Sequence, residues 1–253
     1  MLQNIGIPLL LTVLAGLSTT IGAFITFFIK KSMIGTKFCF LCLAMGFSAG
    51  VMIFVSFVEL LPESITNLGF MVAMVAFFAG MLIIYFIDTL IPHMYEEEKG
   101  EDLNKKLLAS GMLIMIGIAI HNFPEGIAVF FSSLSSIKFG LPIAIAIALH
   151  NIPEGISVAM PIYYATKKKR TAFLYSFLSG VAEPVGAILS IIILYRFINE
   201  FTLNIIFAAV AGIMVFISFD ELLPYAYKHH NKHTIILGIL SGMFMMALSL
   251  WLL

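Results

Sequence analysis

The residues best suited to chemistry in this sequence lie in two copies of one short motif. Residues 121–126 read HNFPEG and residues 150–155 read HNIPEG. In each copy the His and the Glu are four residues apart, a spacing that places both side chains on one face of an α-helix. Neutral imidazole and carboxylate groups are ligands that suit Zn²⁺, Fe²⁺, Mn²⁺ or Co²⁺, whereas Cu(I) prefers thiolates. The two motifs therefore predict a site for a divalent transition metal between two helices.

The Asn and the Pro of each motif add to this prediction. Asn122 and Asn151 follow the His directly, roughly 100° further around the helix, so each amide can reach a neighbouring ligand position. Each Pro removes one backbone hydrogen bond and frees the carbonyl group four residues earlier. Glu183, which is also followed by Pro, repeats the combination of an acid with a freed carbonyl in a third segment.

The composition predicts that these residues lie inside a membrane. Of the 253 residues, 61% are hydrophobic and 11% are charged, whereas a soluble domain has about 25% charged residues. The formal net charge is zero, which argues against a nucleic-acid-binding protein, because such proteins present a basic face. We therefore expect an integral membrane protein whose partners are the lipid bilayer and a cation.

The apolar segments predict an all-α protein with eight transmembrane helices in a single domain, residues 1–253. A spanning helix needs about 20 apolar residues, and helix is required because backbone groups find no water in the hydrocarbon layer. Short polar connectors separate the segments. The expected spans are 5–29, 38–61, 68–91, 107–131, 139–164, 172–198, 203–223 and 234–253.

The basic residues predict the orientation of these spans. Of the 14 Lys and Arg residues, 12 fall in the first, third, fifth and seventh connectors, while the other side of the membrane holds Lys138 and Arg196. By the positive-inside rule the odd-numbered connectors lie in the cytosol and both termini lie outside it. The protein is therefore expected in the cell membrane, crossing it many times.

An internal repeat predicts how the spans are arranged. Residues 49–62 and residues 211–224 share ten of fourteen positions, AGVMIFVSFVELLP against AGIMVFISFDELLP. They belong to spans 2 and 7, which cross the bilayer in opposite directions. Spans 4 and 5 repeat each other through the HNxPEG motif. The pattern predicts a 3+2+3 inverted repeat, an architecture typical of alternating-access carriers with a site near the bilayer midplane.

Depth in the membrane indicates which acids belong to the site. Seven of the fourteen acids fall inside apolar spans, where a carboxylate costs about 2.5–3.5 kcal/mol on insertion scales. His121, His150 and Glu183 lie within about two residues of the expected span centres, so within roughly 3 Å of one plane. Glu125 and Glu154 lie one helical turn further along. Three carboxylates with two imidazoles and two amides can hold two cations, which predicts a binuclear site.

Three other roles for these residues fit the sequence less well. Interhelical hydrogen bonding is one, although ionisable groups are costly for that purpose. An intramembrane metalloenzyme or a metal sensor is the second, but the HExxH motif of zinc proteases is absent. A carrier of organic anions is the third, and it would place Lys or Arg at a span centre, where this sequence has none.

Three further acids are candidates for the pathway of a cation. Glu59 and Glu221 occupy the same position of the internal repeat, near opposite ends of their spans, and Asp220 precedes Glu221. We predict an entrance ligand at one end and an exit ligand at the other, with acids at helix ends near the headgroups as the alternative.

A cluster of histidines and a pair of cysteines, both away from the span centres, each allow two interpretations. His229, His230 and His233 fall in the cytosolic connector after span 7, where they either receive metal or form an ordinary polar loop. Cys39 and Cys42 form a CxxC that can hold a soft metal, although a single pair is more typical of two small helix residues.

The motifs resemble those of the ZIP (Zrt/Irt-like) family of metal transporters, and within it the bacterial zinc-uptake ZupT-like subgroup. The resemblance covers the whole chain and rests on HNFPEG, HNIPEG, AEP at 182–184 and SFDELLP at 218–224. It implies no catalytic activity and no catalytic cofactor. The metal ligands that it implies are His121, Asn122, Glu125, His150, Asn151, Glu154 and Glu183.

The resemblance also implies a mechanism and a range of cargo. Members of the family resemble elevator-type carriers, in which spans 1, 4, 5 and 6 slide against a scaffold that is often dimeric. The commoner eukaryotic pattern reads HExPHE in span 5, whereas this sequence has Asn151 and ends in Gly155. That departure favours a broader specificity, with one or two ions of Zn²⁺ or Fe²⁺ as substrate and manganese, cobalt and cadmium as further cargo.

Overall fold

The computed structural model describes residues 5–28, 40–89, 103–194, 199–227 and 232–252, and all regular structure within these ranges is helical. The α-helices are α1 (Gly6–Thr26), α2 (Phe40–Val55), α3 (Leu61–Leu68), α4 (Phe70–Thr89), α5 (Leu103–Ser135), α6 (Ile137–Thr166), α7 (Lys169–Leu194), α8 (Glu200–Ile217), α9 (Leu223–Tyr227) and α10 (Lys232–Leu252). Two π-helical turns, η3 (Ser56–Leu60) and η4 (Ser218–Leu222), join α2 to α3 and α8 to α9.

Eight helical segments in these ranges are long and apolar enough to cross a membrane, so the predicted number of spans is confirmed. The second segment runs from Cys42 to Leu68, further than the expected end at residue 61. Its last turns are polar, and Pro62 occupies the first turn of α3, where a proline is tolerated. Gly69 ends this helix with φ of +79°, a conformation that favours glycine, and α4 begins at the next residue.

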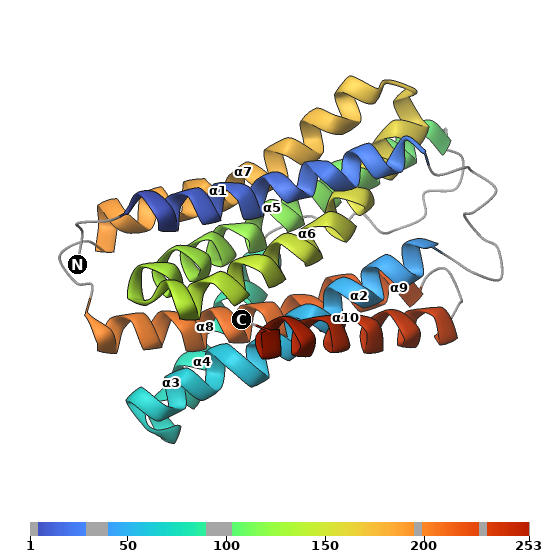
Figure 1. Cartoon of the computed structure of the whole chain (residues 1–253). Helices are drawn as coiled ribbons and strands as arrows, with labels where there is room; N and C mark the ends of the chain where they lie inside the picture. Colours follow the sequence, from blue (N-terminus) through green and yellow to red (C-terminus); the bar gives the residue numbers. More distant parts are fainter. Residues whose placement is uncertain (1–4, 29–39, 90–102, 195–198, 228–231, 253) are drawn as a thin grey trace.

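The helices form two groups that lie against each other (Figure 1). The first helix group consists of α1, α5, α6 and α7, which pack extensively on one another. The second helix group consists of α2, α3, α4, α8, α9 and α10, with α2 packed along α10 and α4 along α8. Contacts between the groups come chiefly from α6 against α2 and from α5 against α8.

Close backbone contacts at glycine hold each group together. A Cβ atom at Gly16 in α1 would overlap the carbonyl oxygen of Gly180 in α7, and one at Gly180 would overlap that of Gly16. In the second group, Gly46 and Gly50 of α2 lie equally close to the backbone of α10. Every overlap of this kind at a glycine that the structure describes lies within one helix group. Small residues at helix contacts let transmembrane backbones approach closely.

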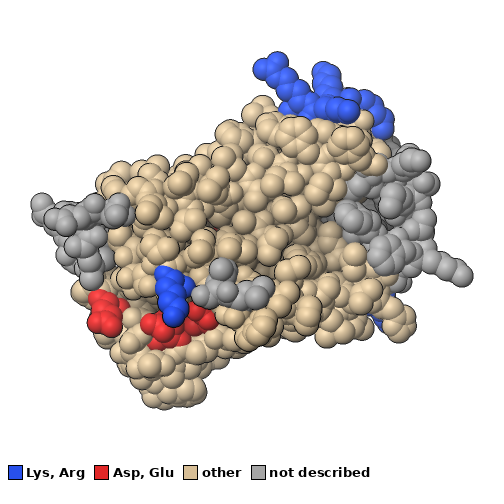
Figure 2. All heavy atoms as spheres, in the orientation of Figure 1, with Lys and Arg blue, Asp and Glu red and all other residues tan. Residues whose placement is uncertain are grey.

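The boundary between the groups is mostly apolar. Phe130, Phe131 and Ile147 of the first group and Met52 and Met214 of the second are fully buried and belong to one hydrophobic cluster. The outer surface is apolar as well, and the described Lys, Arg, Asp and Glu side chains visible in Figure 2 gather towards the two ends of the molecule. This distribution is the one expected for a protein surrounded by lipid.

The repeated SFxEL sequence forms the same unusual turn in both of its copies. The N–H of Leu61 bonds to the carbonyl of Ser56, five residues back, and the N–H of Leu223 bonds in the same way to Ser218. A proline follows each turn, and its ring clashes with a regular α-helical turn before it. The sequence repeat predicts that the two segments are related, but it does not predict the wide turn.

The prolines of the HNxPEG motifs do not unwind their helices. Helix α5 continues through Pro124, α6 through Pro153 and α7 through Pro184. Each proline still removes one backbone hydrogen bond, so its effect is a freed carbonyl within a continuous helix. The site therefore stands on three continuous helices, with its side chains held at fixed heights along them.

Candidate metal site

The seven predicted ligands all lie inside the first helix group. His121, Asn122 and Glu125 project from α5, His150, Asn151 and Glu154 from α6, and Glu183 from α7, and all seven are fully buried. Helices α5, α6 and α7 pack against one another, and α1 covers α6. Burial of three carboxylates is costly unless each meets a partner or a bound cation.

The two HNxPEG motifs pair crosswise. The Nε2 atom of His150 lies 3.2 Å from Oε2 of Glu125, and Nε2 of His121 lies 3.2 Å from Oε2 of Glu154. Each His therefore meets the Glu of the other motif, rather than the Glu four residues along its own helix. The spacing within each helix is sufficient to place His and Glu on one face, but the antiparallel packing of α5 on α6 determines which groups meet.

The two Asn side chains are oriented by neighbouring helices. Asn122 donates from Nδ2 to the carbonyl oxygen of Ser179 in α7, at 3.1 Å, and Asn151 donates from Nδ2 to that of Ala15 in α1, at 2.9 Å. The Nδ2 atom of Asn151 also donates to Oε1 of Glu183. Since the amide N–H groups are used in this way, the Oδ1 atoms are left to accept.

The unpaired buried atoms match the donors that a divalent cation requires. Apart from Oε2 of Glu154, which faces Nε2 of His121 at 3.2 Å, four buried carbonyl or carboxylate oxygens of this cluster have no hydrogen-bond partner among the described residues: Oδ1 of Asn122, Oε1 of Glu125, Oδ1 of Asn151 and Oε2 of Glu183. Buried polar atoms in native proteins almost always have a partner. Oxygen donors beside two imidazoles suit zinc or ferrous iron.

Ser48 adds a contact from the second helix group that the sequence did not predict. Its Oγ donates to Oε1 of Glu154 at 3.2 Å, and Ser48 is fully buried in α2. The residue at the same position of the second repeat copy is Val210, which has no hydroxyl group, so the internal repeat gives no indication of this hydrogen bond. Ser48 directly precedes the first repeated segment, which is the one sequence signal that points to it.

The ligands come together as pairs rather than as a closed coordination sphere. Within the part of the chain that the structure describes, no three His, Cys, Asp or Glu side chains are arranged to hold one metal ion directly. Each imidazole is engaged by a carboxylate. A metal that binds here must therefore displace at least one carboxylate from its imidazole, with a shift of side chains.

The three acids predicted to line the cation pathway lie away from this cluster. Glu59 is partly buried in η3, Asp220 is exposed in η4, and Glu221 belongs to η4 with a side chain that is not described. All three are on the π-helical turns of the second helix group rather than on the helices that supply the seven ligands.

The remaining His and Cys residues also lie away from the cluster. Cys42 is buried in α2, and His233 is exposed in the first turn of α10. Cys39, His229 and His230 lie outside the described residues. Their roles stay open.

Comparison with known proteins places the same motifs in a transporter family. The family described as "ZIP Zinc transporter" matches residues 93–250, which include all seven predicted ligands. Three similar proteins carry the name "Zinc transporter ZupT" and align over nearly the full length of this chain.

These relatives come from three different bacterial species. The protein of Clostridium perfringens is 47% identical, with 99% of this chain and 97% of that protein aligned. That of Oceanobacillus iheyensis is 49% identical over 100% of both chains, and that of Chlorobium phaeovibrioides is 51% identical over 97% of both. Identity at this level therefore extends over nearly the whole of each chain.

Proposed function

This chain belongs to the ZIP zinc transporter family, and we propose that it carries Zn²⁺ across the cell membrane through the buried cluster on α5, α6 and α7. It is a multi-pass membrane protein and a transporter rather than an enzyme. One observation supports the assigned site above others. Two crosswise His–Glu pairs lie fully buried beside four oxygens without hydrogen-bond partners, which is a cation's donor set in a layer otherwise apolar.

When zinc binds at this cluster, Zn²⁺ replaces a proton on the imidazole. In each His–Glu pair the Nε2 atom faces the carboxylate, so it bears the proton of the contact. Zinc takes the same Nε2 lone pair, which requires the imidazole to lose that proton, and it then bonds the carboxylate as well. The Asn oxygens and Glu183 complete the ligand set. Three carboxylates with two imidazoles are sufficient for two ions, and we propose a binuclear site.

The cargo is proposed to include other divalent metals. The donor set has no thiolate, and imidazole with carboxylate and amide oxygen binds Fe²⁺, Mn²⁺ and Co²⁺ as well as Zn²⁺. The affinity order of such ions is a property of the metal more than of the site, so iron is a second cargo of this chain in our proposal, with cadmium as a further competitor.

Movement is proposed to follow the division of the helices into two groups. The first helix group supplies all seven proposed ligands, and its helices are joined by close glycine contacts that, at the glycines the structure describes, do not extend to the second group. The boundary is lined by side chains such as Phe130 and Met52, and apolar surfaces of this kind can slide without breaking many directional bonds. An elevator-type motion of the first group against the second is supported by this arrangement.

Two matched contacts within the first helix group support an inverted repeat. A Cβ at Gly22 would overlap the carbonyl oxygen of Ile152, and a Cβ at Gly186 would overlap that of Phe123. Gly22 and Gly186 are repeat-related, and Ile152 and Phe123 hold the same position of HNxPEG. Contacts that recur in this way give the protein two related conformations that open to opposite sides. We keep the homodimer as a proposal drawn from the family resemblance alone.

The experiment is zinc uptake into metal-free proteoliposomes. Wild type, Glu125→Ala and His150→Ala are compared, with Glu200→Ala as a control, because Glu200 is an exposed acid at the start of α8. We expect saturable wild-type uptake, a loss of more than tenfold in the first two variants and little change in the control. A panel of Fe²⁺, Mn²⁺, Co²⁺ and Cd²⁺ as competitors ranks the cargo.

Uptake that persists in both folded variants would contradict the assigned site and would shift attention to Glu59 and Glu221. Bound zinc without uptake by wild type would contradict transport itself and would favour a sensor.

A further inference from the structure

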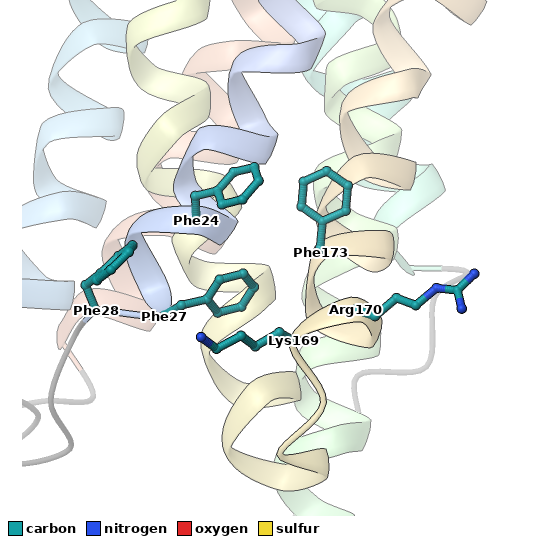
Figure 3. A pocket seen from close by; sticks show the side chains of 6 residues that line it. All are labelled: Phe24, Phe27, Phe28, Lys169, Arg170 and Phe173. Atoms are coloured by element: carbon teal, nitrogen blue, oxygen red, sulfur yellow. The ribbon is translucent and has the colours of Figure 1, made fainter.

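A shallow hollow opens at one end of the first helix group, between the C-terminal end of α1 and the N-terminal end of α7 (Figure 3). Its volume is about 430 Å³, within the range of small-molecule sites, and it is lined by Phe24, Phe27, Phe28, Lys169, Arg170 and Phe173. None of these residues has a part in the metal site described above. Both helices end their membrane-spanning stretch here, at Thr26 and Lys169, so the hollow lies at the rim of the spans.

The apolar half of this hollow is built from aromatic rings. The rings of Phe24 and Phe173 meet edge to face across the gap between the helices, with centroids 5.3 Å apart, and Phe24 contacts Phe27 at 6.2 Å. Phe24 is 55% exposed and Phe28 is 83% exposed, so a large part of each side chain is open to the surroundings. Exposed phenyl rings at the rim of the spans offer an apolar surface of the kind on which an acyl chain packs.

The polar half is supplied by the start of α7. Lys169 extends towards α1, and its Nζ atom lies 5.4 Å from the centroid of the Phe27 ring (Figure 3). Arg170 lines the same hollow while its guanidinium group points away from the α1 rings. Both are exposed. A phospholipid has a charged phosphate directly next to its apolar acyl chains. A cation held against an aromatic ring beside an apolar surface is complementary to that arrangement.

The charge of the site selects the lipid. Residues 167–170 are four consecutive basic residues, all exposed, and none of them forms an ion pair with any residue that the structure describes. A zwitterionic headgroup brings its own positive charge to such a place, whereas an anionic headgroup does not. Basic residues at the membrane surface gain about 1 kcal/mol each from anionic lipid, which is about fivefold in binding.

We propose that this hollow is a binding site for an anionic phospholipid of the surrounding bilayer, with the phosphate at Lys169, an acyl chain against Phe24 and Phe173, and Arg170 adding positive charge at the rim. Because α1 and α7 both belong to the first helix group, the lipid binds to one of the two bodies rather than bridging them. The site is independent of the metal ligands and of the proposed transport route.

The test is lipid retention measured by native mass spectrometry. Purified full-length protein is exchanged into micelles that contain equal amounts of phosphatidylglycerol and phosphatidylcholine. Three proteins are compared: wild type, Lys169→Gln/Arg170→Gln, and Lys167→Gln/Lys168→Gln. The last variant removes the same charge from the same connector but leaves the lining of the hollow intact.

We expect wild type to retain phosphatidylglycerol in preference to phosphatidylcholine, and the 169/170 variant to lose this preference by about 10- to 25-fold. In the 167/168 control, the preference for phosphatidylglycerol should fall as well, but by less than half of the logarithm of the fall in the 169/170 variant. A fourth protein, Phe24→Ala/Phe173→Ala, should lower the retention of both lipids, because it removes the surface for the acyl chain.

Equal losses in the two charge variants would overturn the site, since they would indicate general attraction to the basic connector. Equal retention of the two lipids by wild type would overturn the selectivity for anionic lipid. Circular dichroism and size-exclusion profiles establish that each variant is folded before retention is scored.

Discussion

Glu125 in α5 and His150 in α6 lie 3.2 Å apart, and each belongs to a different copy of the HNxPEG motif. The reciprocal pair of Glu154 with His121 has the same separation. In both pairs the imidazole Nε2 atom that a metal would bind is the atom that faces the carboxylate. Metal and proton therefore compete for one atom, and this relationship determines how the site should respond to pH.

Lower pH should weaken zinc binding. Imidazole in model compounds takes up a proton near pH 6.5, and each imidazole that must be deprotonated reduces the affinity by at most about tenfold per pH unit below its titration point. The sign follows because protonation is favoured at low pH and the metal binds only the deprotonated ring. Isothermal titration of detergent-solubilised protein at pH 7.5 and pH 5.5 measures the change.

The control for the pH experiment is His233→Ala, which removes an exposed imidazole at the start of α10. It should leave the pH dependence unchanged, whereas His121→Ala should reduce it. An affinity that is the same at both pH values in wild type would show that the imidazoles are not ligands.

Glu183→Gln should lower the number of zinc ions bound from two to one. Gln keeps the shape of the side chain and an oxygen acceptor but removes the charge of the third carboxylate, which a second divalent cation needs in an apolar layer. Elemental analysis of zinc per chain after dialysis gives the number. The matched control, Glu200→Gln, should still bind two zinc ions. If Glu183→Gln also binds two zinc ions, the Glu183 carboxylate is not required for the second ion.

Ser48→Ala should lower the apparent melting temperature of the metal-free protein. The hydroxyl donates to a buried carboxylate oxygen of Glu154, and hydrogen bonds to charged groups are worth about 1.5–3 kcal/mol. Saturating zinc should shrink the difference from wild type, because the metal then neutralises the carboxylate. Differential scanning fluorimetry with and without zinc measures both effects.

Ser56→Ala is the control for Ser48→Ala. Ser56 is also fully buried in the same transmembrane segment, but its hydroxyl donates to the carbonyl of Met52 within its own helix, at 2.7 Å. A fall in the melting temperature of Ser56→Ala that equals the fall in Ser48→Ala, with the same response to zinc, would argue against a specific role for the contact with Glu154.

Gly16→Val should destabilise the first helix group. A side chain at this position overlaps the carbonyl oxygen of Gly180 in α7, so α1 and α7 must move apart, at a cost of about 1–3 kcal/mol or more. Gly6→Val is the matched control, because no heavy atom lies within 4 Å of a Cβ at that position of the same helix. If both variants unfold at the same temperature in one detergent, the close contact of α1 with α7 is not a source of stability.

The orientation predicted from basic residues should be visible by cysteine labelling. In a background with Ser at 39 and 42, a membrane-impermeant maleimide should label Ser136→Cys in intact cells and Lys168→Cys only after permeabilisation. Both positions are exposed and lie at opposite ends of α6. The opposite pattern would place the termini in the cytosol and would invalidate the orientation.

The sequence was sufficient to predict the spans and to select candidate ligands, because both steps depend on local properties. Hydrophobic length determines whether a segment can span the bilayer, and that count of eight is confirmed. An acid such as Glu125 is too costly in hydrocarbon to be there without a purpose, so residue type and depth identify it. Helical periodicity adds that His121 and Glu125 share a face, which requires no knowledge of neighbouring helices.

Pairing and packing were decided only by the tertiary structure, because they depend on which helices lie side by side. Periodicity cannot indicate that His150 meets Glu125 rather than Glu154, nor that Ser48, 106 positions from Glu154 in the chain, donates to it. The wide turns η3 and η4 follow from a local clash before proline that hydropathy does not register. The hollow between Phe24 and Phe173 exists because the ends of α1 and α7 converge, and contacts between residues distant in sequence are a property of the folded chain alone.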